Sequence, residues 1–149
     1  MGFKQDLQIG QKAQEYIVKQ LSKEFKGIKS VPGLCSDCDL IADNGYTIEV
    51  KFDLKSKLTN NIGIEYRYKG KPSGIAKTKS QEWVHIYYLN GWVYSRIKVN
   101  DLKAYLKSNW GYLPKLKGGD NNNSKMVIVK SEDFANRFGF MPILSRQDS

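Results

Sequence analysis

Apolar and polar positions alternate along the chain with a period that changes at several points. From Leu7 to Phe25, apolar side chains recur at helical spacing and Gly27 follows as a stop signal, so this segment predicts an amphipathic helix. After residue 37 the period changes to two, which is the period of a strand. Strands are predicted at 38–42, 46–52, 62–68, 83–89, 92–97 and 126–129, and helices at 77–82, after an Asn100 cap and after a Ser131 cap.

Two Asn-Gly pairs mark the sharpest predicted turns. Asn44-Gly45 and Asn90-Gly91 each stand between two runs of alternating apolar residues, which is the strongest local signal for a β-hairpin. In the second strand of the first hairpin, Tyr46, Ile48, Val50 and Phe52 should share one face, and Thr47, Glu49 and Lys51 the other.

The order of elements predicts one α/β or α+β domain over residues 1–149, with a single mixed sheet flanked by helices. The stretch 117–125 is rich in Gly and Asn and is expected to form a flexible loop, and the tail after Leu144 is expected to fray. Aromatic residues that alternate within strands are expected to pack in the core rather than to stack on bases. They are Trp83, Tyr87, Trp92 and Tyr94.

The charge balance points to a polyanionic partner. The chain has 24 Lys and Arg against 15 Asp and Glu, for a net charge of +9, and a small domain this basic usually meets nucleic acid. Between residues 51 and 79 the cationic side chains far outnumber the acidic ones. Those expected to contact phosphates are Lys69, Lys71, Lys77 and Lys79, the alternative being a solvated Lys-rich loop.

Other features limit the class of protein. No apolar run approaches the ~18 residues of a membrane span, and the charged N-terminus does not resemble a signal peptide, so an intracellular protein without a membrane partner is expected. The Cys35–Cys38 pair has no second CxxC and His85 is the only histidine. Two reduced structural thiols are therefore favoured over a zinc site, which needs about four ligands.

Three residues carry the predicted chemistry. The Asn44-Gly45 turn folds Asp39 back beside Glu49, so that two carboxylates converge, and Lys51 follows on the face of Glu49. Mg²⁺ takes one or two carboxylates together with waters and phosphate oxygens, and bound metal supplies a hydroxide near neutral pH. A neighbouring lysine can orient the water and stabilise the charge that develops on phosphorus. The alternative is an exposed cross-strand ion pair between Asp39 and Lys51.

The run DLIADNGYTIEVK, with Asp39, nine intervening residues and Glu49-x-Lys51, resembles the PD-(D/E)xK nuclease superfamily over roughly residues 5–90. It is similar to the central hairpin of archaeal-type Holliday junction resolvases and phage-encoded members. The resemblance implies a restriction-endonuclease-like core in the order αβββαβ. Cys38 stands where the family often has proline.

The resemblance also implies roles for individual residues. Asp39, Glu49 and the Val50 carbonyl would bind Mg²⁺, for which Mn²⁺ would substitute, and Lys51 would be the catalytic lysine. Family members often add a Glu from the first helix. Here Glu15 is the better ligand chemically and Gln14 the better placed on the apolar stripe, so both stay open with Glu15 favoured.

The expected function is a metal-dependent endonuclease that hydrolyses DNA, with branched DNA such as a Holliday junction as the preferred substrate. A sequence-specific homing or restriction endonuclease of phage or mobile-element origin would use the same site. A homo-oligomer is expected because cutting two strands needs two sites. A non-catalytic nucleic-acid-binding domain is the alternative from another class, and the sequence leaves RNA as a substrate open.

Overall fold

The computed structural model describes residues 3–30, 39–118 and 122–144. Cys35, Cys38, the middle of the predicted 117–125 loop and the tail after Leu144 lie outside or partly outside this range. The helical elements are α1 (Phe3–Leu21), α2 (Ser56–Thr59), the 3-10 turn η1 (Gly74–Ala76), α3 (Val99–Asn109) and α4 (Ser131–Phe138). No helix in the described parts of the chain is both long enough and apolar enough to cross a membrane.

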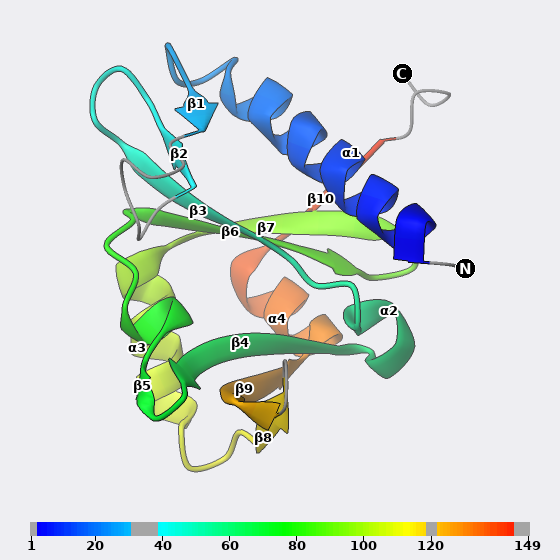
Figure 1. The fold of residues 1–149 in the computed structure, drawn as a ribbon, viewed down its shortest axis with the longest axis vertical. Helices are drawn as coiled ribbons and strands as arrows, with labels where there is room; N and C mark the ends of the chain where they lie inside the picture. The colour runs from blue at the N-terminus through cyan, green and yellow to red at the C-terminus, as the bar shows by residue number, and fades with distance from the viewer. Residues whose placement is uncertain (1–2, 31–38, 119–121, 145–149) are drawn as a thin grey trace.

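The central sheet is mixed and has the strand order β1-β2-β3-β6-β7-β10. Strands β3 and β6 run parallel, and the remaining neighbours are antiparallel. The strands are β1 (Lys29–Ser30), β2 (Leu40–Ile41), β3 (Thr47–Phe52), β6 (Glu82–Tyr88), β7 (Trp92–Lys98) and β10 (Met141–Pro142). The coarse expectation of an α/β protein with a mixed central sheet and flanking helices is therefore confirmed (Figure 1).

A second sheet contradicts the expectation of one sheet. It is antiparallel, has the order β5-β4-β9-β8, and contains the strand predicted at 62–68. Its strands are β4 (Asn61–Tyr68), β5 (Lys71–Pro72), β8 (Lys115–Gly118) and β9 (Ser124–Lys130). The alternation in 62–68 was a sound signal for a half-buried strand, but alternation does not say which sheet the strand joins.

The two faces of the central sheet have different covers. Helix α1 lies over one face, where Ile17 and Leu21 pack against Ile48 and Val84. The other face is covered by the second sheet together with α3 and α4, as Figure 1 shows. Because side chains alternate along β3, Glu49 and Lys51 point to the second face, away from α1. The predicted division of β3 into an apolar face and a polar face is confirmed.

Several local predictions differ from the structure. The first helix ends at Leu21, and Phe25 stacks on Tyr46 beyond its end, so the apolar period continued past the helix. No helix forms at 77–82; the turn comes earlier, at Gly74–Ala76.

The predicted caps are also displaced. Helices α3 and α4 begin after Lys98 and Lys130, neither of which makes a side-chain cap hydrogen bond, so Asn100 and Ser131 lie inside the first turns. Part of the expected 117–125 loop is strand, because β8 and β9 approach it from both sides.

Candidate active site

The first hairpin brings Asp39 opposite Glu49. Leu40 pairs with Ile48 in the antiparallel β2–β3 ladder, so Asp39, which precedes Leu40, lies across from Glu49, which follows Ile48. The turn has the local form expected of a three-residue hairpin loop: the Gly45 N–H donates to the Ala42 carbonyl at 2.9 Å, and Gly45 has a φ of +89°. A glycine is favoured there because other residues adopt this conformation at a cost.

The Asp39 carboxylate is held against β3. Its Oδ2 accepts a hydrogen bond from the Val50 N–H at 2.8 Å, and its own N–H donates to the Ile48 carbonyl at 3.0 Å. Asp39 is nevertheless exposed to solvent. The carboxylate is therefore oriented by backbone groups and still accessible to a ligand.

Glu49 is the buried member of the pair, with 9% of its surface exposed. The Thr78 hydroxyl donates to Glu49 Oε1 at 3.0 Å, and Lys51 Nζ lies 3.1 Å from Oε2. Burial raises the pKa of Glu49; the Lys51 ammonium lowers it, and the Asp39 carboxylate raises it. The net pKa is raised, as expected when two carboxylates share a partly desolvated site.

Lys51 lies between Glu49 and an aromatic ring. Its Nζ is 5.7 Å from the centroid of the Trp83 ring, and its side chain is 42% exposed. Trp83 is placed there by the parallel β3–β6 register, in which it stands beside Glu49. The ammonium is thus oriented on one side by a carboxylate and on another by an aromatic face, while solvent still reaches it.

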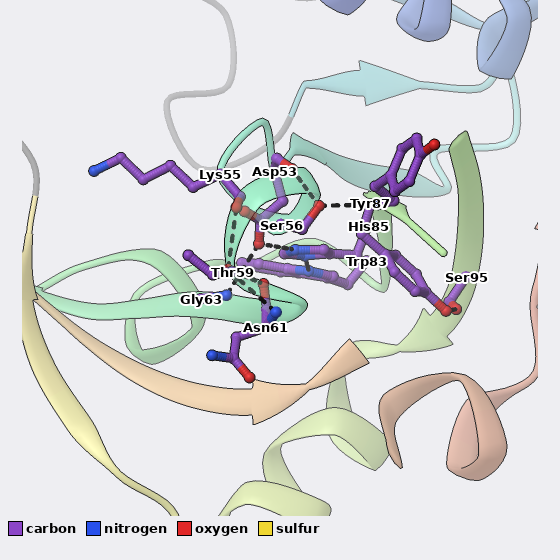
Figure 2. A network of polar contacts seen from close by, with 11 residues as sticks. Asp53, Lys55, Ser56, Thr59, Asn61, Gly63, Trp83, His85, Tyr87 and Ser95 are labelled. Carbon is purple, nitrogen blue, oxygen red and sulfur yellow. Dashed lines mark hydrogen bonds and ion pairs between the residues drawn. The ribbon is translucent and has the colours of Figure 1, made fainter. Parts of the chain in front are cut away.

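A chain of hydrogen bonds through His85 and Asp53 holds the Trp83 ring (Figure 2). The indole N–H donates to His85 Nδ1 at 3.1 Å, and His85 Nε2 lies 3.0 Å from Asp53 Oδ2. An indole nitrogen can only donate, so Nδ1 accepts and the proton of a neutral imidazole is on Nε2, donated to Asp53. The same Asp53 oxygen accepts the Gly63 N–H of β4 at 3.0 Å.

His85 is 1% exposed and is held between Trp83 and Asp53. The chain from Trp83 to Asp53 joins β6, the residue that follows β3, and β4 of the second sheet. It therefore ties the two sheets together directly beneath Lys51.

The acidic donors of the site are the carboxylates of Asp39 and Glu49, which face each other across the hairpin. Among the residues that the structure describes, no group of three or more His, Cys, Asp or Glu side chains converges. Two carboxylates are sufficient for Mg²⁺, which keeps several waters. The Val50 carbonyl is a further oxygen on this side. The backbone groups of Thr47 and Asp53 form hydrogen bonds toward β6. Backbone polar groups alternate between the two sides of a strand, so the Val50 carbonyl faces the β2 side, where Asp39 lies.

The helix residues do not complete this site. Glu15 and Gln14 are both exposed on α1, and α1 packs on the opposite face of β3 from Glu49. The expectation that Gln14 faces the core is wrong, because the buried stripe is Ala13, Ile17 and Leu21. The small side chain of Ala13 gave a weak signal next to the larger apolar residues.

The predicted phosphate-contacting lysines fall in two places. Lys77 and Lys79 are exposed on either side of buried Thr78, whose hydroxyl bonds Glu49, so they flank the candidate site. Lys69 and Lys71 are exposed at the β4–β5 turn of the second sheet. Glu65 of β4 accepts a hydrogen bond from the Ser124 hydroxyl at 2.6 Å.

Two contacts to the site were missed from the sequence. Thr78 contacts Glu49, and Trp83 contacts Lys51. The predicted core positions of Trp83, Tyr87 and Tyr94 are confirmed by their burial. A signal existed for Thr78: the run Lys77-Thr78-Lys79-Ser80 alternates cation and hydroxyl, which predicts one wet and one buried side. No local signal predicted the contact of Trp83 with Lys51, because it depends on the parallel register between β3 and β6.

Comparisons of the chain with protein-family models, with curated proteins and with solved structures found no match.

Proposed function

We propose that the chain is a metal-dependent nuclease that hydrolyses phosphodiester bonds in DNA, with Asp39, Glu49 and Lys51 as its catalytic residues. The observation that carries the proposal is the convergence of these three side chains. Asp39 lies across the hairpin from Glu49, and Lys51 Nζ is 3.1 Å from Glu49 Oε2, an arrangement consistent with the PD-(D/E)xK motif that the sequence resembles.

The connectivity of the central sheet supports the same assignment. Helix α1 is followed by the antiparallel strands β1, β2 and β3, and β6 then joins β3 in parallel. This agrees with the αβββαβ order of a restriction-endonuclease-like core, with β1 rather than the 62–68 strand as one of the three. The connection from β3 to β6 carries α2, β4, β5 and η1, where the superfamily has one helix.

Each residue would have a distinct task. Asp39 and Glu49, with the Val50 carbonyl, would hold Mg²⁺, which supplies a polarised phosphate and an activated water when bound. Asp39 is pre-oriented by the Val50 N–H and Glu49 by the Thr78 hydroxyl. The Lys51 ammonium can donate hydrogen bonds to the attacking water or to a phosphate oxygen, and so stabilise the charge that develops there. Lys77 and Lys79 would contact the flanking phosphates.

The test is a cleavage assay on labelled four-way junction, flap, duplex and single-stranded DNA, and on RNA, with Mg²⁺ or Mn²⁺. Wild-type protein should cut at least one DNA substrate, and Asp39→Asn should lose cleavage while binding in EDTA is retained. Preference for the junction would identify branched DNA as the substrate. Binding without cleavage of any substrate would instead identify a non-catalytic nucleic-acid-binding domain.

A further inference from the structure

The second sheet carries a row of cations that the candidate active site does not use. In the β4–β9 ladder Arg67 stands opposite Lys125, and in the β8–β9 ladder Lys117 stands opposite the same Lys125. Residues directly opposite in antiparallel strands project from the same face. The three charged side chains therefore form one row across three strands, named here the cationic row, and all three residues are exposed.

Among the residues that the structure describes, this arrangement is electrostatically unfavourable. Like charges that face each other across a ladder repel. Within the described residues, none of the three is part of an ion pair. The acidic residue nearest in the ladder, Glu65, pairs with Met126 and so lies on the other face, where it accepts a hydrogen bond from Ser124.

The dimensions of the row fit a nucleic-acid backbone. Two strand spacings make the row about 10 Å long, and one strand of a duplex advances about 3.4 Å per phosphate along its axis, so the row spans about three phosphate-to-phosphate steps. Its β4 end leads toward the candidate active site. The Ser73 N–H donates to the Tyr66 carbonyl at 3.0 Å, which docks the segment before Lys77 and Thr78 onto the end of β4.

We infer that the cationic row is a second phosphate-binding surface, which holds the backbone of a nucleic acid at a distance from the cleavage site. This inference deepens the proposed function by naming where the substrate is held, and it concerns binding rather than cleavage. Contacts to phosphates carry no sequence information, so binding through the cationic row would be independent of the DNA sequence.

The test measures binding of a labelled DNA duplex in EDTA over a series of NaCl concentrations. The variant is Lys117→Gln/Lys125→Gln, and the control is Lys12→Gln/Lys19→Gln, which removes the same charge from exposed positions of α1. Arg67 is left in place because its Nη1 donates to the Gly70 carbonyl at 3.1 Å within the hairpin. The row variant should bind more weakly, and its log–log salt slope should fall by about 1.8, since each phosphate contact contributes about 0.9.

A second readout separates this role from a merely solvated face. Lys125→Gln removes the central charge of the row, so it should raise the midpoint of thermal unfolding while it weakens DNA binding. Equal salt slopes for the row variant and the α1 control would overturn the inference, as would binding of anionic lipid vesicles in place of DNA. Binding is measured in EDTA, where no cleavage occurs, so it is tested separately from cleavage. Binding through the row without cleavage of DNA in the presence of metal would refute the proposed nuclease and support the inference about the row.

Discussion

At the scale of single residues, Glu49 is the most constrained group of the candidate site. It is nearly buried, it lies close to another carboxylate, and it is stabilised by one ammonium and one hydroxyl. Burial raises the pKa of Glu49, while the Lys51 ammonium and the hydrogen bond from Thr78 lower it in part. A bound divalent cation would satisfy the pair further, which is the physical link between this geometry and metal-assisted hydrolysis.

Trp83 offers a direct test of the hydrogen-bonded chain beneath Lys51. Trp83→Phe keeps an aromatic ring but leaves His85 Nδ1 without its donor in the core, which should cost about 1–3 kcal/mol in the free energy of unfolding in urea. Trp92→Phe is the control, because Trp92 is only half-buried. Similar losses in the two variants would contradict the assigned role of the indole N–H.

We expect the ionisation of Tyr46 to lower the free energy of unfolding at alkaline pH. Burial and the hydrogen bond that its hydroxyl donates to Glu82 at 2.8 Å raise its pKa from 10.0 to about 12. A raised pKa favours the protonated form in the folded state, so this stabilisation is complete below pH 10 and is lost as the pH rises through about 12.

Tyr46→Phe retains the ring that stacks on Phe25 and removes the titrating hydroxyl. Compared with wild type, it should be less stable by about 1 kcal/mol at neutral pH, and the difference should vanish between pH 10 and pH 12. Unfolding in urea across this range measures it. A difference that does not change with pH would refute the assignment.

At the scale of elements, the sequence predicted what depends on neighbours along the chain. The Asn44-Gly45 and Asn90-Gly91 hairpins formed, because turn residues and alternation are local signals. The relation of Glu49 to Lys51 followed for the same reason. What could not be predicted is long-range: the second sheet, the contact of Thr78 with Glu49, and the exposed position of Glu15 all depend on how elements pack.

Gly74 tests whether the turn before Thr78 is required by close packing. An added Cβ at Gly74 would lie 2.2 Å from the Glu65 carbonyl oxygen, whereas one at Gly70 would meet nothing within 4 Å. Both glycines have positive φ, at +51° and +79°, so alanine at either should incur about 1–2 kcal/mol of backbone strain.

Gly74→Ala should therefore lose clearly more stability than Gly70→Ala, because the backbone of β4 or η1 must also shift. Thermal unfolding of the two variants gives the comparison. A shifted η1 should also slow cleavage, since Thr78 would leave Glu49. Equal melting temperatures would show that the close approach to Glu65 is not a constraint.

At the scale of the whole molecule, the candidate catalytic residues and the cationic row lie on different sheets. The central sheet carries Asp39, Glu49 and Lys51, and the second sheet carries the cationic row of Arg67, Lys125 and Lys117. Asp53 joins them through Gly63 and His85. The chain as a whole carries a net charge of +9.

The most direct measurement compares the Mg²⁺-dependent cleavage rates of wild type, Lys51→Met and Lys103→Met on one labelled DNA substrate. Lys103 is exposed on α3, so both variants lose one positive charge, but only one loses the ammonium beside Glu49. Lys51→Met should be slower by about 10²–10⁴-fold, and Lys103→Met should match wild type. No cleavage by wild type, or equal rates for all three proteins, would contradict the account.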